Sequence, residues 1–111
     1  MDNSLKESLD HANKMKVFNN QLRLLKEKYL ERNIHFTVGH QFTIDLKLIN
    51  YCITLKNQNK LKDVIMLDDY DLPVRIDDLE SFYDNIMDLY QQNLNAYIVE
   101  YNKLVQDKGR I

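Results

Sequence analysis

The stretch from Val64 to Phe82, VIMLDDYDLPVRIDDLESF, limits the fold more than any other part of the chain. It contains the only proline, Pro73, whose fixed φ and missing N–H suit a turn or an edge strand and exclude a helix interior. An apolar run comes before the acidic segment Asp68–Asp71, and a second short extended run follows it. We therefore expect two strands, over residues 63–67 and 72–76, joined by an acidic turn.

This stretch leads into a long helix. We expect Asp77 to cap a helix that runs from Asp78 to about Lys108, where Gly109 ends it. Apolar residues recur along this helix at spacings of three and four: Leu79, Tyr83, Ile86, Tyr90, Leu94, Tyr97, Tyr101 and Leu104. Tyrosine is typical of interfaces, because its ring is apolar and its hydroxyl can reach a polar partner. The tyrosines of this line predict a contact with another helix, of the same chain or of another chain.

A second long helix is expected near the N-terminus, because no glycine or proline interrupts the segment Asn3–Glu31. Asn3 or Ser4 can cap it, and Glu7 completes a capping box with Ser4. It also carries one apolar stripe: Leu5, Leu9, Ala12, Met15, Phe18, Leu22, Leu25 and Tyr29. From Met15 onward the spacing alternates between three and four, as in a coiled coil. At about 1.5 Å per residue the helix is roughly 40 Å long, more than a small core can cover, so we expect residues 1–22 to form an extended oligomerisation or docking arm.

The middle of the chain reads as a hairpin and a short helix. Alternating residues predict strands over 34–38 and 41–44, joined by a two-residue turn at Gly39–His40. Thr43 or Asp45 can then start a short helix. The predicted fold class is α+β. Two long helices flank a small, mainly antiparallel sheet of short strands and one short helix, and residues 1–111 form a single domain.

The short helix is expected to end before the polar run at residues 56–60. It carries the only cysteine, Cys52, which therefore cannot form a disulfide within the chain. We expect this thiol to be an inert core residue rather than a catalytic one, because no base is adjacent to it in the sequence.

Charge is distributed unevenly along the chain. Residues 1–62 carry 11 Lys/Arg and 6 Asp/Glu, a balance of +5, whereas residues 63–111 carry 4 and 11, a balance of −7. Two interpretations stay open: oppositely charged faces that meet, within a chain or between copies, or two solvated helix faces. The overall charge of −2 disfavours a free-standing nucleic-acid binder. The sequence lacks a signal peptide and an apolar run of membrane-spanning length, so we expect a soluble protein made in the cytoplasm.

Chemistry-bearing patterns are scarce. His35 and His40 could approach one metal, but a site needs three or four ligands with defined spacing. The aspartates of the corner lack the glycine and the spacing of a calcium loop and are expected to serve turns and helix caps. Phosphate-binding glycine loops and nucleophile elbows are also missing from the sequence. We therefore expect a protein that is not an enzyme and uses no cofactor or metal.

Two segments carry a resemblance to a known family: FTID at Phe42–Asp45 and LPVRIDDLESFYDNI at Leu72–Ile86. Over about residues 23–105 the order of elements resembles a domain of unknown function found in bacteriophage tail-fibre and tail-assembly-associated proteins. In that family an aspartate ends a strand ahead of a short helix, and a strand–turn–strand unit precedes a capped terminal helix. The resemblance implies a virion-associated structural or attachment role and names no catalytic residues.

The sequence therefore predicts a bacteriophage structural protein of the tail, tail fibre or head, made in the host cytoplasm and located in the virion. Its expected partners are further copies of itself, other virion proteins or both, with no nucleic acid and no membrane. The alternative is a small intracellular interaction protein, such as a phage-encoded inhibitor or an antitoxin-like regulator, that masks a host protein. The candidate interface residues are Leu5, Leu9, Met15, Phe18, Leu22, Leu25, Tyr83, Tyr90, Tyr97 and Tyr101.

Overall fold

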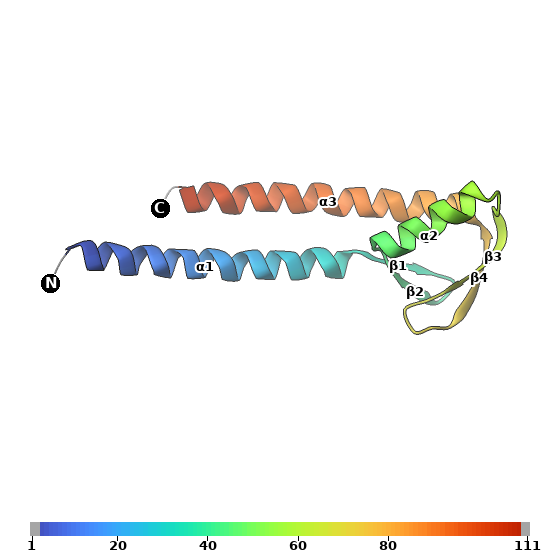
Figure 1. Ribbon diagram of the computed structural model, residues 1–111, viewed down its shortest axis with the longest axis horizontal. Helices are drawn as coiled ribbons and strands as arrows, with labels where there is room; N and C mark the ends of the chain where they lie inside the picture. The colour runs from blue at the N-terminus through green and yellow to red at the C-terminus, as the bar shows by residue number, and fades with distance from the viewer. Residues whose placement is uncertain (1–2, 110–111) are drawn as a thin grey trace. The chain divides into compact units, whose positions relative to one another are not determined.

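A computed structural model describes residues 3–109, with side chains described for residues 3–107. The order of elements is α1 (Asn3–Arg32), β1 (Ile34–Thr37), β2 (His40–Thr43), α2 (Leu46–Asn57), β3 (Lys62–Leu67), β4 (Pro73–Asp78) and α3 (Leu79–Gly109) (Figure 1). The fold is α+β, as predicted, but the strands form two antiparallel two-stranded sheets rather than one small sheet. The chain divides into two compact units: the arm, residues 3–30 and 94–109, and the head, residues 31–93.

The first hairpin of the head pairs β1 with β2, with Thr37 opposite His40. The turn residues are Val38 and Gly39, at φ 49° and 78°. Positive φ at both central residues is the geometry that two-residue hairpins prefer, and it suits glycine far better than valine. The predicted turn at Gly39–His40 was therefore wrong by one residue. The register that results turns Phe42 into the core, where it is buried.

The second hairpin is the corner predicted from the sequence. Val64 pairs with Ile76 and Met66 with Val74, and all four side chains are buried on one face of the sheet. Pro73 is the first residue of β4, a position that does not require its missing N–H. Buried and exposed residues alternate over residues 63–67 and 73–77, as expected for a sheet with one covered face, and the alternation ends at the pair Lys62 and Asp78, which are both exposed.

An aspartate caps the N-terminus of each of the two helices that follow a strand, α2 and α3. Asp45 caps α2 by accepting a hydrogen bond from Leu48 N at 2.8 Å, which selects Asp45 over Thr43. Asp78, not Asp77, caps α3, because its Oδ1 accepts from Glu80 N at 3.1 Å and from Ser81 N at 3.3 Å. The predicted cap was off by one residue because β4 continues through Asp78.

The hydrophobic core lies in the head. Its most buried side chains are Phe42, Cys52, Leu79 and Ile86, contributed by β2, α2 and the first part of α3. The Phe82 ring packs edge-on against the Phe42 ring, with 5.3 Å between centroids. In α2 the buried side chains are Ile49 and Cys52, the single cysteine that was predicted to be a core residue. In α3 they are Leu79 and Ile86, which belong to the predicted stripe, and Phe82, which lies outside it.

Candidate functional site

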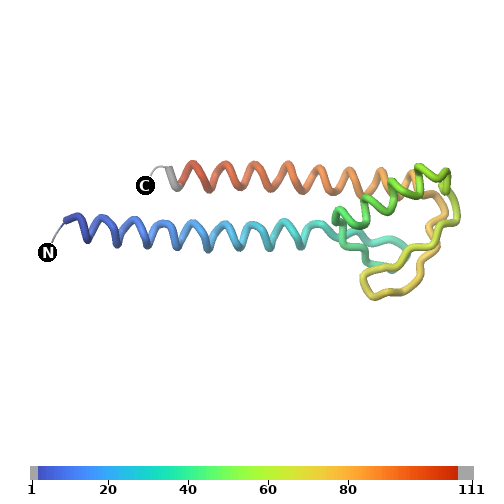
Figure 2. The backbone as a smooth tube through the Cα atoms, viewed as in Figure 1, coloured from blue at the N-terminus to red at the C-terminus, as the bar shows by residue number. Residues whose placement is uncertain are grey.

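The arm consists of two helical segments that run in opposite directions side by side, which Figure 2 shows as two coiled tubes. The rings of Tyr29 and Tyr97 meet edge to face, with 4.9 Å between centroids. Lys28 Nζ lies 3.0 Å from Glu100 Oε1 in an ion pair one turn along α3. Further along, a cavity of about 370 Å³ is lined by residues of both helices, among them Phe18 and Leu104. The predicted coiled-coil stripe of α1 therefore has a partner in the same chain.

No side chain of the arm is buried, taking the described side chains of residues 3–30 and 94–107 together. The stripe that faces α3 is only half-buried, at Met15, Phe18, Leu22, Leu25 and Tyr29. Leu5 and Leu9, further toward the N-terminus, are 49% and 53% exposed. A helix in a globular protein is stabilised chiefly by burying an apolar face. In a pair of helices, each helix shields only the side that touches the other, and its remaining sides stay in contact with water.

A second apolar line runs along the arm part of α3, and we call it the outer α3 line: Leu94, Ile98, Tyr101 and Val105. Its members follow one another at spacings of four, three and four, so they share one face of the helix. At about 100° per residue this face is turned by roughly a quarter of the helix circumference from the face of Tyr97 and Leu104. Ile98 is 55% exposed, Tyr101 38% and Val105 40%, whereas Leu94 is half-buried.

Sequence reasoning found only part of this line. Tyr101 was placed on one stripe with Tyr97 and Leu104, whereas Ile98 and Val105 were missed. The signal was present, because the spacing from Leu94 to Val105 is as regular as that of the predicted stripe. Two apolar lines that share one helix blur each other in a periodicity analysis.

Two of the predicted interface tyrosines belong to the head. Tyr83 and Tyr90 are half-buried and pack against the hydrophobic core. Lys56 Nζ lies 4.3 Å from the centroid of the Tyr83 ring, a cation–π contact that joins α2 to α3. The structure therefore divides the predicted interface residues into an arm group and this pair.

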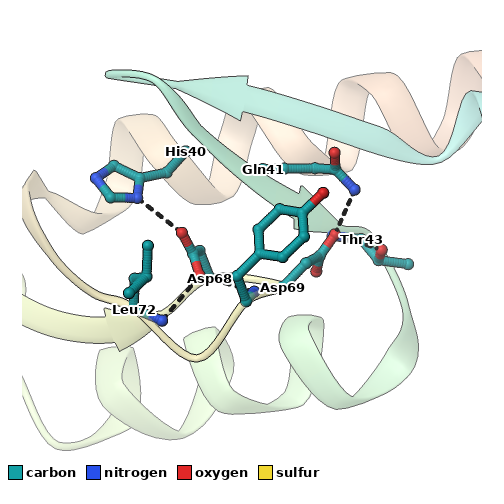
Figure 3. A network of polar contacts seen from close by, with 7 residues as sticks. His40, Gln41, Thr43, Asp68, Asp69 and Leu72 are labelled. Carbon is teal, nitrogen blue, oxygen red and sulfur yellow. Dashed lines mark hydrogen bonds and ion pairs between the residues drawn. The ribbon is translucent and has the colours of Figure 1, made fainter.

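The acidic turn after β3 is held by hydrogen bonds within the head (Figure 3). Asp68 is buried; its Oδ2 lies 2.8 Å from His40 Nδ1, and its Oδ1 accepts from the backbone N–H groups of Tyr70 and Leu72. The hydrogen bond with His40, followed by those from the backbone, lowers the pKa of the Asp68 carboxyl. Asp68 therefore serves the turn, as predicted, and also ties the turn to β2, which the sequence did not reveal.

Asp69 makes the second connection between the acidic turn and β2. Its Oδ1 accepts from Thr43 N at 2.8 Å, and its Oδ2 accepts from Thr43 Oγ1 at 2.8 Å and Gln41 Nε2 at 2.9 Å. The Asp69 N–H also donates to Gln41 O at 2.9 Å. Protein donors therefore satisfy both oxygens of the carboxylate, and Asp69 acts as a structural clamp between the acidic turn and β2 (Figure 3).

A groove of about 680 Å³ lies beside this clamp, between α2 and the second hairpin. Its apolar lining includes Leu48, Tyr51, Ile65 and Leu67. Carboxylates also line it, together with one cation: Asp45, Asp68, Asp69, Asp71 and Lys47. The volume is in the range of small-molecule pockets, and the Thr43 hydroxyl that donates to the Asp69 carboxylate at its edge belongs to the clamp.

The remaining candidates for chemistry are buried or alone. Cys52 is fully buried, and this burial raises the pKa of its thiol to about 11, the opposite of what a reactive cysteine needs. Burial also lowers the pKa of His35, whose ring packs edge-on against Phe82. Among the described residues, His, Cys, Asp and Glu side chains form no group of three or more that could hold a metal ion.

Comparisons with family models, with curated proteins and with solved structures gave no match for this chain. Within residues 3–109, no helix has an apolar stretch long enough to cross a lipid bilayer.

Proposed function

We propose that this chain is a non-enzymatic assembly protein that acts through protein–protein contacts of its arm. One observation carries the proposal: the arm displays apolar side chains in regular lines and buries none of them among its described side chains. Long apolar lines on a helix pair are stabilising only when another surface removes them from water. An arm of this kind therefore requires a partner to become a stable element.

We further propose that the assembly is a bacteriophage virion, in which the chain is a tail, tail-fibre or head-attached component. The resemblance of residues 23–105 to a domain of tail-associated phage proteins supports this assignment. Peptide mass spectrometry of purified phage particles is expected to find the chain in a constant ratio to the major structural proteins. Particles that lack the chain would contradict the virion assignment.

The second candidate is a small intracellular protein that masks a host protein. The groove of the head favours it, because an apolar lining with carboxylates suits a cationic segment that carries an apolar anchor. A pull-down from infected cells with the tagged chain separates the two functions. A virion component recovers other phage proteins, whereas a masking protein recovers one host protein in stoichiometric amount. Substitution of Ile65, in the groove, by glutamate is then expected to abolish that recovery.

A further inference from the structure

The outer α3 line is the surface of the arm from which we argue its partner. We propose that two copies of this chain pair through Leu94, Ile98, Tyr101 and Val105, with their α3 helices antiparallel, so that the two arms form a four-helix bundle. This inference rests on the proposed function, because it names the partner that the arm assembles with. It adds a specific contact surface, a symmetry and an orientation.

The spacing of the outer α3 line is that of a coiled-coil seam. Apolar residues at intervals of four, three and four occupy the inward positions of a heptad repeat and interlock with the same positions of a facing helix. The three most exposed members are isoleucine, tyrosine and valine, each at least 38% accessible. Exposing such a regular apolar line to water is unfavourable in free energy. Covering it with a matching line of another helix is favourable.

The residues beside the outer α3 line favour a second copy over a charged partner. One flank is formed by Asn95 and Asn102, and the other by Tyr97 and Leu104, so neither flank carries a charge. Charges at such flanking positions normally select a partner of opposite sign or repel one of the same sign. Without them, the flanks on α3 do not repel a second copy, and a strongly charged partner gains no ion pair there.

The antiparallel orientation follows from the order of residues along the outer α3 line. It places Ile98 against Tyr101 of the second copy and Leu94 against Val105 of the second copy, and each contact occurs twice. Asn95 and Asn102, which share one flank, then face each other across the pair and can exchange amide hydrogen bonds. Opposed helix dipoles add a small favourable term. The contact is self-complementary and closes at two copies, so it does not propagate into a filament.

The arm of each copy supplies further apolar surface to such a bundle. At about 100° per residue, Leu30 of α1 lies on the side of the helix pair that carries the outer α3 line, opposite the side where Lys28 pairs with Glu100, and it is 63% exposed. A stable dimer usually removes about 800 Å² of surface per partner, more than the four residues of one helix line provide. The second helix of each arm is therefore needed, which is why the proposal is a four-helix bundle and not a helix pair.

Analytical ultracentrifugation of the full chain, from about 2 to about 200 μM, tests the pairing. We expect the mass to rise with concentration toward twice the chain mass of 13.3 kDa. Ile98→Lys puts a charge on the outer α3 line and is expected to weaken dimerisation by about 100-fold or more. Val99→Lys is the matched control, because Val99 is the next residue, is 64% exposed and lies off the line. It should dimerise like the wild type, and circular dichroism should show equal helix content in both variants.

The outcomes separate this inference from the proposed function. A wild-type dimer that Ile98→Lys leaves intact, or that both variants weaken equally, overturns the outer α3 line but keeps assembly through the arm. A wild-type monomer at all concentrations that still enters phage particles overturns self-pairing and keeps the proposed function. A dimer that Ile98→Lys alone disrupts supports the inference even if the chain is missing from particles, in which case only the virion assignment fails.

Cross-linking tests the orientation. Proteins with Ile98→Cys alone and Tyr101→Cys alone are mixed and oxidised with copper phenanthroline. Antiparallel pairing predicts a disulfide between the two different variants and little between identical ones. Efficient cross-linking of Ile98→Cys with itself would indicate parallel helices and overturn the proposed geometry. The native Cys52 does not interfere, because its thiol is fully buried in the head.

Discussion

The head and the arm share the helix α3 but differ in what covers it. In the head, Leu79 and Ile86 are fully buried beneath two hairpins and α2, whereas in the arm Ile98 and Val99 are 55% and 64% exposed. Both parts of α3 carry apolar residues at helical spacing. Periodicity therefore shows that a helix has an apolar face, and the structure shows whether that face is covered within the chain.

The largest expected effect compares truncations in the two regions. Ile86→Ala removes buried methyl groups from the core and is expected to cost about 2–5 kcal/mol of the free energy of unfolding. Leu22→Ala in the arm, where the side chain is only half-buried, should cost about 1 kcal/mol or less in dilute solution. Urea denaturation followed by circular dichroism measures both. Equal costs would show that the arm is as well covered as the head.

The next effect concerns the buried amide of Asn93, which ties the last residue of the head to its first residues. Asn93 Nδ2 donates to Arg32 O and to Asn33 Oδ1, both at 2.8 Å. Asn93→Leu removes this donor from both oxygens and is expected to cost about 1–3 kcal/mol. Gln92→Leu changes the neighbouring exposed side chain and should alter stability by less than about 0.5 kcal/mol. Thermal melting of the two variants would contradict this account if their midpoints fell equally.

A smaller effect is expected from pH, and it belongs to the head. The pKa of Asp68 is lowered in the folded protein, so the unfolded chain binds the proton more readily. The stabilisation by Asp68 is therefore complete at pH values above the pKa of this carboxyl in the unfolded chain, about 4. It is lost as the pH falls through the lower pKa in the folded protein. Asp68→Asn should flatten this acid limb in melting curves recorded at several pH values. Asp71→Asn, at an exposed position, should leave the limb unchanged.

The smallest expected effect is a gain at the first hairpin. Val38 has φ 49°, which is unfavourable for a β-branched residue, and its side chain is 86% exposed, so it contributes little packing. Val38→Asn gives the Asn-Gly pair that such turns prefer and should stabilise the head by about 1 kcal/mol. Val38→Gly should also stabilise if the gain comes from the backbone. Destabilisation by both variants, measured in urea, would contradict the assigned turn.

Much of the fold was predictable because local rules decide it. The Pro73 corner, the two long helices and the burial of Cys52 all followed from residue type and spacing. The separation of the strands into two sheets was not predicted. The turn and the helix cap were each displaced by one residue, to Val38–Gly39 and to Asp78, and at the cap two adjacent aspartates are chemically able to serve. Local signals mark the neighbourhood of such a boundary, and packing then selects the residue.

The candidate site was less predictable because its parts are distant in the sequence. The connection of Asp69 to Thr43 spans 26 residues, and no local pattern distinguishes it from an ordinary turn aspartate. The division of the apolar residues of α3 into two lines could be read from spacing. Which line faces α1 could not, because that depends on the pairing of two helices far apart in the chain.

The reactivity of the single cysteine, Cys52, can report when the core of the head opens. Because the Cys52 thiol is fully buried and its pKa is raised to about 11, a thiol reagent can react with it only after the core has opened. The labelling rate of the unmodified protein therefore measures the free energy of head opening. No label needs to be introduced, and the arm contributes no background among residues 3–30 and 94–109 because it contains no cysteine. Binding of any partner to the head would be detected as a slower rate at this one atom.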